Sequence, residues 1–343
     1  MAPQVSTSTL PAPATGFFER IYFFIRLWGL QKVAEYGVAT LRTFQPLPRN
    51  QQPTFTKSYA ARPHLKNRIF VPRSHKPDEL LPLYIDIHGG GFALCNPSFD
   101  DEFCADFANA NNFLIVSLDY SKAPQSAFPT ATDDIEALIH AVLEDEALPF
   151  DKNRVAIGGF SAGGNLALSA VQAPELQGKI HAVVPWYPVL EWVTTTEQKL
   201  KTRPYRNEKD VDLLEAMGPM FNYGYIKEGQ DLLNPRLSVS YADKKTLPKW
   251  IFFVGAEYDM LCAEAKDMVM DLAGLNEAEM EECIYSFERG TYRWRMARGV
   301  MHGYTHNIGP ETPDQVVRLQ RCEETFAEVG EWLKTGPFAI SKS

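Results

Sequence analysis

A glycine-rich strand-to-helix turn constrains the fold of this chain more than any other segment. The apolar run 155–157 leads into Gly-Gly-Phe-Ser-Ala-Gly-Gly at residues 158–164, and helix-forming residues follow. A strand, a tight turn and a helix in this order form a nucleophile elbow, in which the serine adopts a strained backbone conformation. That conformation needs small residues two positions before and after the serine, and Gly159 and Gly163 meet this need. We therefore predict that Ser161 is an exposed nucleophile at a helix N-terminus, where the helix dipole favours developing negative charge.

Two other interpretations of this turn are a structural glycine loop and a phosphate-binding loop. A phosphate-binding loop would end in Gly-Lys-Ser/Thr, and that ending is missing here. The catalytic interpretation is therefore favoured.

A second glycine motif lies upstream. The apolar run 83–87 leads into residues 88–92, which read His-Gly-Gly-Gly-Phe. Three successive glycines let the backbone turn its amides toward a ligand at close range. The predicted oxyanion donors are the amides of Gly90, Gly91 and Ala162. Loss of one such donor typically costs about 3 kcal/mol of transition-state stabilisation. Because His88 begins the turn, we assign His88 and Gly89 to supporting the loop rather than to acting as a base.

Composition excludes several classes of protein. The chain has 343 residues, of which 45% are hydrophobic, so it can bury a large core. Its net charge of -9 and pI near 5.4 argue against a nucleic-acid partner, which needs a basic surface. The five cysteines are scattered without a Cys-x-x-Cys pair, so we expect neither a disulfide framework nor a zinc site. Small molecules are the expected partners.

The N-terminal region has two parts. Residues 1–15 are rich in Pro, Ser, Thr and Ala and lack periodicity, so we expect a mobile tail. From Phe17 to Trp28, apolar residues recur at the spacing of one helical face. This helix could pack on the rest of the protein, cover a pocket, or anchor the protein at a membrane surface through its basic neighbours. The apolar segment 17–30 is shorter than the roughly 20 residues that span a bilayer, and charged residues interrupt it. We therefore do not expect it to cross a membrane. We expect a cytoplasmic protein.

From about residue 66, short apolar runs alternate with longer helical stretches. This alternation predicts a mostly parallel sheet with helices on both faces. The predicted strands lie near 68–71, 83–87, 113–118, 154–157, 182–185, 250–254 and 283–287. The predicted helices lie near 99–110, 131–143, 162–171, 263–272 and 314–333. Between about 189 and 248 there is no buried-strand signal, which indicates an insertion above the sheet with a helix near 211–220.

Together, the two glycine motifs resemble those of the hormone-sensitive-lipase-like esterases, within the α/β-hydrolase superfamily. The family elbow reads Gly-Asp-Ser-Ala-Gly-Gly-Asn-Leu-Ala, and residues 159–167 read Gly-Phe-Ser-Ala-Gly-Gly-Asn-Leu-Ala. Residues 119–129 resemble the family connector Asp-Tyr-Arg-Leu-Ala-Pro-Glu-His-Pro-Phe-Pro. The connector departs at Ser121, Lys122, Gln125, Ser126 and Ala127. The resemblance implies an α/β-hydrolase fold with a helical cap. It also implies a core of residues 61–188 and 249–343, with cap elements in 1–60 and 189–248.

The resemblance also selects the partners of Ser161, which follow it in the order acid, then histidine. Residues 256–264 are similar to the segment that carries the family's catalytic acid, and the match selects Asp259, with Glu257 as a weaker substitute. His302 begins a His-Gly-Tyr sequence that is similar to the family's His-Gly-Phe. His306 lies four residues further on, but no carboxylate-rich context accompanies this pair, so we predict no metal and no cofactor.

Two departures from the family pattern concern the surroundings of the site. Phe160 replaces a polar residue beside the nucleophile, and the aromatic and basic run 291–298 predicts a longer strand or hairpin, either structural or in contact with substrate. The candidate substrate-binding residues are Phe92, Phe160, Trp186, Tyr187, Met217, Phe221 and Tyr304. Further aromatic and apolar candidates are Trp192, Met220, Tyr223 and Tyr225 in the insertion.

The sequence therefore predicts a serine-dependent carboxylic ester hydrolase that cleaves small to medium apolar esters through an acyl-enzyme. A second hypothesis keeps the triad but assigns acyl transfer, lactone opening or cyclisation. A third is a small-molecule receptor, because the resembling family includes hormone receptors that lack the triad histidine. Retention of His302 argues against the receptor. A homodimer is left open.

Overall fold

The centre of the molecule is a nine-stranded sheet in the order β1-β2-β4-β3-β5-β6-β7-β9-β8. The computed structural model describes residues 9–44, 46–205, 211–306 and 313–339. Its strands are β1 (Phe55–Tyr59), β2 (Arg62–Phe70), β3 (Leu81–Ile87), β4 (Leu114–Leu118), β5 (Phe150–Phe160), β6 (Ala182–Trp186), β7 (Trp250–Tyr258), β8 (Ser286–Arg289) and β9 (Tyr292–Met301). Along the sheet, the strands from β4 to β9 pair in parallel, whereas β1, β2 and β8 form antiparallel edges. The predicted mostly parallel sheet is confirmed.

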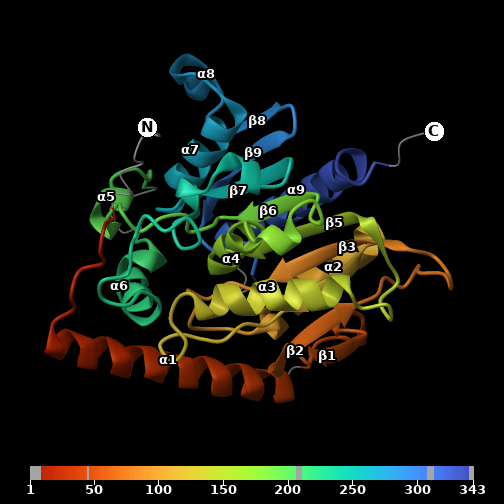
Figure 1. Cartoon of the computed structure of the whole chain (residues 1–343), viewed down its shortest axis with the longest axis horizontal. Coiled ribbons are helices and arrows are strands. Elements are labelled where there is room, and N and C mark those ends of the chain that lie inside the picture. Colours follow the sequence, from red (N-terminus) through yellow and green to blue (C-terminus); the bar gives the residue numbers. More distant parts are fainter. Residues whose placement is uncertain (1–8, 45, 206–210, 307–312, 340–343) are drawn as a thin grey trace, which may run out of the picture.

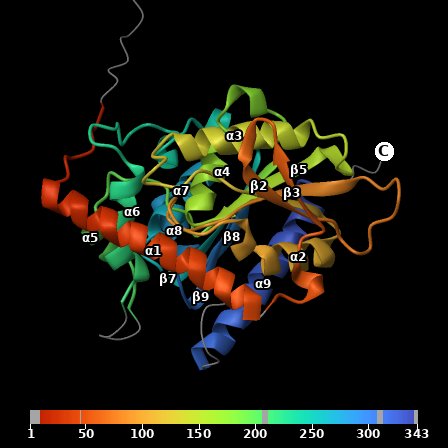
Figure 2. The same cartoon turned by 90° about the horizontal axis from the view of Figure 1, so that it is seen from below.

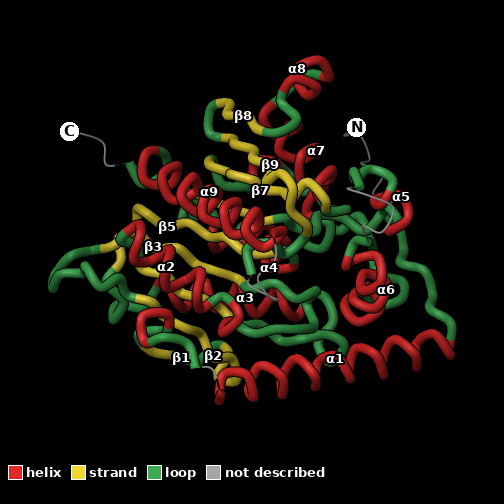
Figure 3. The backbone as a smooth tube through the Cα atoms, turned by 180° about the vertical axis from the view of Figure 1, so that it is seen from behind, coloured by secondary structure: helices red, strands yellow, loops and turns green. Residues whose placement is uncertain are grey.

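Helices cover both faces of this sheet. The α-helices in the described ranges are α1 (Phe17–Phe44), α2 (Asp101–Asn111), α3 (Thr130–Leu143), α4 (Ala162–Ala170), α5 (Thr196–Leu200), α6 (Leu213–Tyr225), α7 (Cys262–Ala273), α8 (Glu277–Glu282) and α9 (Pro313–Thr335). Helices α3 and α4 lie in front of the sheet in Figure 1, and α2 and α9 lie behind it, as the reverse view in Figure 3 shows. This is the layered arrangement that the alternation of strands and helices predicts.

The central strands explain why the sequence shows continuous apolar runs. Every residue of β3 is buried. Leu83, Ile85 and Ile87 belong to the core cluster that includes α3 and α4, whereas Tyr84 belongs to the cluster that includes α2 and α9. Because helices cover both faces, both sides of the strand are largely apolar and strict alternation is lost. The exception is Asp86, which is fully buried and accepts a hydrogen bond from Ser117 Oγ at 2.6 Å.

The N-terminal segment differs from the expected mobile tail. Residues 1–8 lie outside the described part of the chain, but residues 9–15 lie against the loop that follows α6. The amide of Ala12 donates to the carbonyl of Gln230 at 2.8 Å, and the amide of Leu232 donates to the carbonyl of Leu10 at 2.8 Å. Main-chain hydrogen bonding of this kind needs no side-chain periodicity, so composition alone gave the wrong expectation for residues 9–15.

After this segment, α1 runs along the outside of the molecule and packs on α6 (Figure 2). The expected helix therefore exists and extends beyond Trp28 to Phe44. None of the helices in the described ranges combines the length and apolar character that crossing a membrane requires. The division of the chain at residues 60, 188 and 248 stays a prediction.

The predicted strand or hairpin at 291–298 is confirmed, since β8 and β9 form an antiparallel pair. The arginines of β9 pair with α9: Arg293 Nη2 lies 2.6 Å and Arg295 Nε 3.5 Å from the carboxylate of Glu328. These pairs attach β9 to α9, and contact of this run with substrate stays a prediction.

Candidate active site

Ser161 lies between the end of β5 and the first residue of α4, with φ 54° and ψ -113°. A Cβ on Gly159 would lie 2.4 Å from the carbonyl carbon and oxygen of Gly163, and a Cβ on Gly163 would lie 2.0 Å from the carbonyl oxygen of Ile87. Both glycines are therefore required by close backbone approach. Three chain segments thus meet at this elbow and hold the serine in its strained conformation.

His302 connects the serine to a buried carboxylate. Its Nε2 lies 2.8 Å from Ser161 Oγ, and its Nδ1 lies 2.7 Å from Asp259 Oδ2. Asp259 follows the end of β7, and its other oxygen accepts the amide of Leu261 at 2.9 Å. With Nδ1–H donating to Asp259, Nε2 is free to accept the proton of the serine hydroxyl. The structure therefore brings the three sequence-predicted residues into one hydrogen-bonded chain.

Glu257, the weaker substitute for the acid, points elsewhere. Its carboxylate accepts the amide of Gly299 at 2.7 Å, which ties β7 to β9.

The electrostatic surroundings of His302 favour its protonated form. Burial lowers the pKa of the imidazole, but the charge of Asp259 and the hydrogen bond to it outweigh this effect, and Asp212 adds to it. The net result is a raised pKa. Asp212 was not identified from the sequence.

Asp212 caps the N-terminus of α6 and reaches the segment that carries the acid. Its Oδ1 accepts the amide of Leu214 at 2.8 Å, and its Oδ2 accepts the amide of Met260 at 2.9 Å. Burial and the charge of Asp259 raise the pKa of Asp212, although both amide hydrogen bonds oppose this. The sequence contains one signal for this cap, because Asp212 is followed three residues later by Glu215, the spacing of a capping box.

The glycine motif lies beside the nucleophile. A Cβ on Gly89 would lie 3.6 Å from Ser161 Cβ. Gly90 and Gly91 have φ values of 112° and 59°, which favour glycine. A Cβ on Gly91 would lie 2.4 Å from the ring of Phe221, so α6 packs closely against this loop.

His88 lies behind this loop and is fully buried. Its Nδ1 lies 2.7 Å from the carbonyl oxygen of Gly89, and its ring stacks on Tyr120 with centroids 4.3 Å apart. Burial, and then the charge of Lys122, lower the pKa of His88 to about 4, so the ring is neutral at neutral pH. These contacts agree with the predicted role of His88 in supporting the loop, and they hold its ring against Gly89 and Tyr120.

Phe160 and His306, two residues that sequence analysis singled out separately, contact each other. Their rings meet edge to face with centroids 4.8 Å apart, and His306 Nε2 lies 2.8 Å from Asp100 Oδ1. Burial lowers the pKa of His306 to about 4 and raises that of Asp100 to about 8. Within the described ranges, no group of three or more His, Cys, Asp or Glu residues could hold a metal ion.

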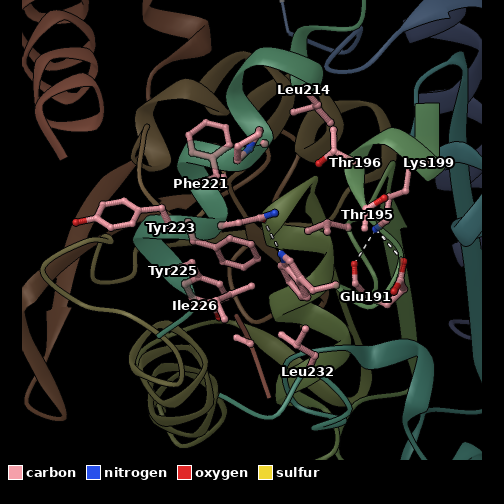
Figure 4. Close-up of a pocket in the computed structure, with 18 of the residues that line it drawn as sticks. Glu191, Thr195, Thr196, Lys199, Leu214, Phe221, Tyr223, Tyr225, Ile226 and Leu232 are labelled. Carbon is pink, nitrogen blue, oxygen red and sulfur yellow. Dashed lines mark hydrogen bonds and ion pairs between the residues drawn. The ribbon is translucent and has the colours of Figure 1, made fainter. Parts of the chain in front are cut away.

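A cavity of about 430 Å³ opens beside Ser161. Among the predicted substrate-binding residues, Phe92 and Phe221 line it, together with Trp192, Tyr223 and Tyr225 from the insertion. Figure 4 shows Phe221, Tyr223 and Tyr225 on one side of this cavity. Phe92 stacks on Tyr225 with centroids 3.7 Å apart. Aromatic side chains therefore form part of the cavity wall, together with aliphatic and polar residues.

The other predicted substrate-binding residues do not line this cavity. Trp186 and Phe160 are fully buried on the opposite face of the sheet, where Trp186 Nε1 donates to Tyr84 Oη at 3.2 Å. Tyr187 packs its ring on His302, and Tyr304 bonds to Thr325. Met217 lies on α6 but outside the lining, and Met220 is completely buried. Large aromatic side chains near an elbow serve the core as readily as a pocket, which is why composition could not separate these roles.

A buried ionic cluster lies at the polar end of the cavity. Lys199 Nζ lies 3.1 Å from Glu191 Oε1, donates to the carbonyl of Glu191 at 2.7 Å and pairs with Glu264. Glu264 in turn accepts the amide of Leu190 at 2.7 Å. Dashed lines in Figure 4 mark the contacts between Lys199 and Glu191. This cluster was not identified from the sequence, because Glu264 lies more than 60 residues from Glu191 and Lys199 and no common motif connects the three.

The chain belongs to the α/β-hydrolase family of hormone-sensitive-lipase-like esterases: the family model, described as an α/β hydrolase fold, matches residues 84–287. A Schizosaccharomyces pombe protein named as an AB hydrolase superfamily protein is 32% identical over 230 residues. That alignment covers 64% of this chain and 66% of the relative, slightly less than two thirds of its length.

Solved structures share the fold along most of the chain. An esterase from the archaeon Pyrobaculum calidifontis is 23% identical with a TM-score of 0.71, covering 96% of this chain and 100% of that one. A thermostable carboxylesterase cloned from a metagenomic library is 22% identical with a TM-score of 0.68, and the match covers 90% of this chain and 97% of that one. One of two fungal esterases from Rhizomucor miehei is 20% identical with a TM-score of 0.68, and the match covers 95% of this chain and 99% of that one. The predicted α/β-hydrolase fold is confirmed.

Proposed function

We propose that this protein is a serine-dependent carboxylic ester hydrolase that acts through an acyl-enzyme. The observation that carries the proposal is the chain of contacts from Ser161 Oγ through His302 to Asp259, at 2.8 and 2.7 Å. These are hydrogen-bonding distances for a nucleophile, a base and an orienting acid. The family and the esterases that share the fold support a carboxylesterase-type hydrolase.

In the first step, His302 Nε2 accepts the hydroxyl proton as Ser161 Oγ attacks the ester carbonyl carbon. Asp259 keeps Nδ1 protonated and stabilises the imidazolium. The amides of Gly90, Gly91 and Ala162 would hold the oxyanion of the tetrahedral intermediate. His302 then protonates the departing alkoxide, which leaves as the alcohol.

In the second step, water loses a proton to His302 and attacks the acyl carbon. The tetrahedral intermediate collapses, the carboxylic acid leaves, and the proton returns to Ser161. The surroundings raise the pKa of His302, so activity should rise with pH as the imidazole loses its proton.

The cavity indicates the substrate class. A volume of about 430 Å³ with an aromatic wall suits a small to medium ester with an apolar acyl or alcohol group. Such a wall discriminates weakly between substrates of different chain length, because one methylene group changes the transition-state binding free energy by only about 1–3 kcal/mol. A homodimer and a cytoplasmic location stay predictions.

Hydrolysis of p-nitrophenyl esters of increasing acyl length tests the proposal. We expect turnover by the natural chain, and a loss of roughly 10⁴- to 10⁶-fold in kcat for Ser161→Ala. Intact-mass detection of a phosphonate adduct on the natural chain, absent from the variant, identifies the reactive serine. Equal hydrolysis by both proteins would contradict the proposal.

Two further outcomes separate the alternatives. If an added alcohol captures the acyl group in preference to water, the same triad carries out acyl transfer. If the phosphonate leaves Ser161 unlabelled and ligand still binds, the receptor interpretation stands; the present contact between His302 and Ser161 favours the enzyme.

A further inference from the structure

Helix α1 is apolar on both sides, although only one side packs on the protein. The inner side carries Leu27, which is completely buried and whose Cδ2 would lie 2.7 Å from a Cβ on Gly224 of α6. Phe23 packs its ring on Tyr223 with centroids 5.7 Å apart. Gln31 Nε2 donates to the carbonyls of Ala93 and Ala123 at 2.9 and 2.7 Å. These contacts fix the helix, so it cannot turn over to bury its other side.

We call the other side the outer face of α1. It consists of large apolar residues that are 43 to 84% exposed, namely Phe17, Phe18, Ile21, Ile25 and Trp28. With about 3.6 residues per turn, the spacing from Phe18 through Ile21 and Ile25 to Trp28 forms one continuous stripe. Figures 1 and 2 show this helix along the outside of the molecule. A contiguous apolar patch of this kind marks an interaction surface.

The charges beside the outer face differ in sign from the rest of the chain. The whole chain carries a net charge of -9, yet the exposed Arg20 and Arg26 occupy helix positions on either side of the stripe. Arg26 Nη1 also donates to Tyr22 Oη at 2.9 Å. Lys32 pairs with Glu35 at 2.7 Å, and Glu19 lines the cavity. An apolar stripe between arginines matches an anionic lipid surface, because the apolar side chains enter the acyl boundary while guanidinium groups remain at the headgroups.

The position of the outer face links this surface to the candidate active site. Residues 12–15, just before α1, line the cavity together with Glu19 and Phe23. The helix that carries the stripe therefore also forms part of the cavity wall. Surface docking through α1 would place this wall at the lipid boundary, where apolar esters concentrate.

We propose that the outer face of α1 is a peripheral docking surface for anionic phospholipid membranes. The helix lies in the plane of the interface with its apolar stripe inserted and without spanning the bilayer. This inference does not depend on the proposed hydrolase activity.

Co-sedimentation of the full chain with phosphatidylcholine vesicles, with or without phosphatidylserine, tests the docking. We expect binding to phosphatidylserine-containing vesicles that salt weakens. The variant Phe18→Ser/Ile25→Ser should bind at least about tenfold more weakly, because two inserted apolar side chains are lost. The matched control Val316→Ser/Leu319→Ser removes two exposed apolar residues from α9 and should bind like the natural chain.

Two further variants sharpen the result. Arg20→Gln/Arg26→Gln should reduce the preference for phosphatidylserine. Ser161→Ala should dock normally, which separates docking from catalysis. Absence of vesicle binding by the natural chain overturns the proposal. The proposal is also overturned if the natural chain is a dimer in solution and the variant Phe18→Ser/Ile25→Ser is a monomer, because a second copy would then cover the outer face.

Discussion

At the scale of single residues, one carboxylate of α6 influences the candidate base. Asp212 accepts the amide of Met260, next to Asp259, and its charge raises the pKa of His302. Asp212→Asn removes the charge and keeps one oxygen that can accept the amide of Met260, while the amide of Leu214 loses its acceptor. Since His302 must be neutral to accept a proton, a lower pKa moves the acidic limb of kcat/KM to lower pH. The pH profile of p-nitrophenyl ester hydrolysis measures this shift.

A structural role alone would give a different pattern. Asp212→Ala loses both the charge and the acceptor, so it should lower kcat as well as move the profile. Glu215→Gln neutralises an exposed carboxylate on the same helix and serves as the control. If Asp212→Asn and Glu215→Gln give the natural pH profile, Asp212 does not act on the imidazole.

The site residues that belong to motifs could be predicted from the sequence, whereas those that depend on tertiary contacts could not. Ser161, Asp259 and His302 stand at fixed offsets from strands and glycines, so they could be predicted. Asp212 accepts the amide of Met260, and its charge raises the pKa of His302, but no sequence pattern connects Asp212 to either residue. The aromatic residues could be assigned only in part for a similar reason. Phe92 and Phe221 line the cavity, but Trp186 ends a strand whose side chains alternate between the faces of the sheet, and only the three-dimensional structure shows which face meets the cavity.

At the scale of elements, the elbow depends on the close approach of α4 to β3. Gly163→Ala would place a methyl group 2.0 Å from the carbonyl oxygen of Ile87. Because the backbone must move, we expect the free energy of unfolding to fall by about 1–3 kcal/mol. The shift of Ser161 should also reduce ester hydrolysis. Urea denaturation measures the first effect and initial rates measure the second.

Gly29→Ala provides the control for this change. Gly29 lies in α1 with nothing within 4 Å of its Cβ position. Alanine favours helices over glycine by about 1 kcal/mol, so this variant should be as stable as the natural chain or more so. Equal unfolding midpoints for both variants would show that the elbow tolerates a side chain.

The elements themselves could be predicted where apolar content was high. Buried parallel strands and long amphipathic helices give strong local signals, and β3 through β7 were located within a few residues. The elements α5 and α8 span five and six residues and carry mainly polar side chains. Capping boxes begin both helices, but helices this short show no periodicity. The edge strand β1 is mostly exposed, so it lacks the apolar run of a central strand.

At the scale of the whole molecule, a buried ionic cluster joins the insertion to the core. Lys199 belongs to α5, Glu264 to α7 and Glu191 to the loop after β6. Burial raises the pKa of Glu264 to about 7, although the charge of Lys199 opposes this. For the neighbouring Glu191, burial is outweighed by Lys199, and its pKa is lowered. One cation therefore holds two carboxylates that would otherwise repel each other.

Lys199→Met tests how strongly this cluster holds the insertion. The substitution leaves two buried carboxylates without a cation, which costs about 3–5 kcal/mol of unfolding free energy when both are ionised. Their pKa values should then rise in the folded state, so the folded protein binds more protons than the unfolded chain. The free energy of unfolding relative to the natural chain should therefore fall as pH rises from the ordinary glutamate pKa of 4.5 through the raised pKa values of the folded state. Urea denaturation at several pH values measures this slope.

Lys201→Met is the matched control, because Lys201 makes an exposed pair with Glu197 on the same helix turn. Exposed pairs of this kind contribute about 0–1 kcal/mol, so its stability should follow that of the natural chain at every pH. A uniform loss of stability in Lys199→Met, independent of pH, would mean that packing of the lysine stem matters and its charge does not. A pH-dependent loss instead assigns the attachment of α5 to charge, and because Lys199 and Glu191 line the cavity, the same variant should also raise KM for bulky esters.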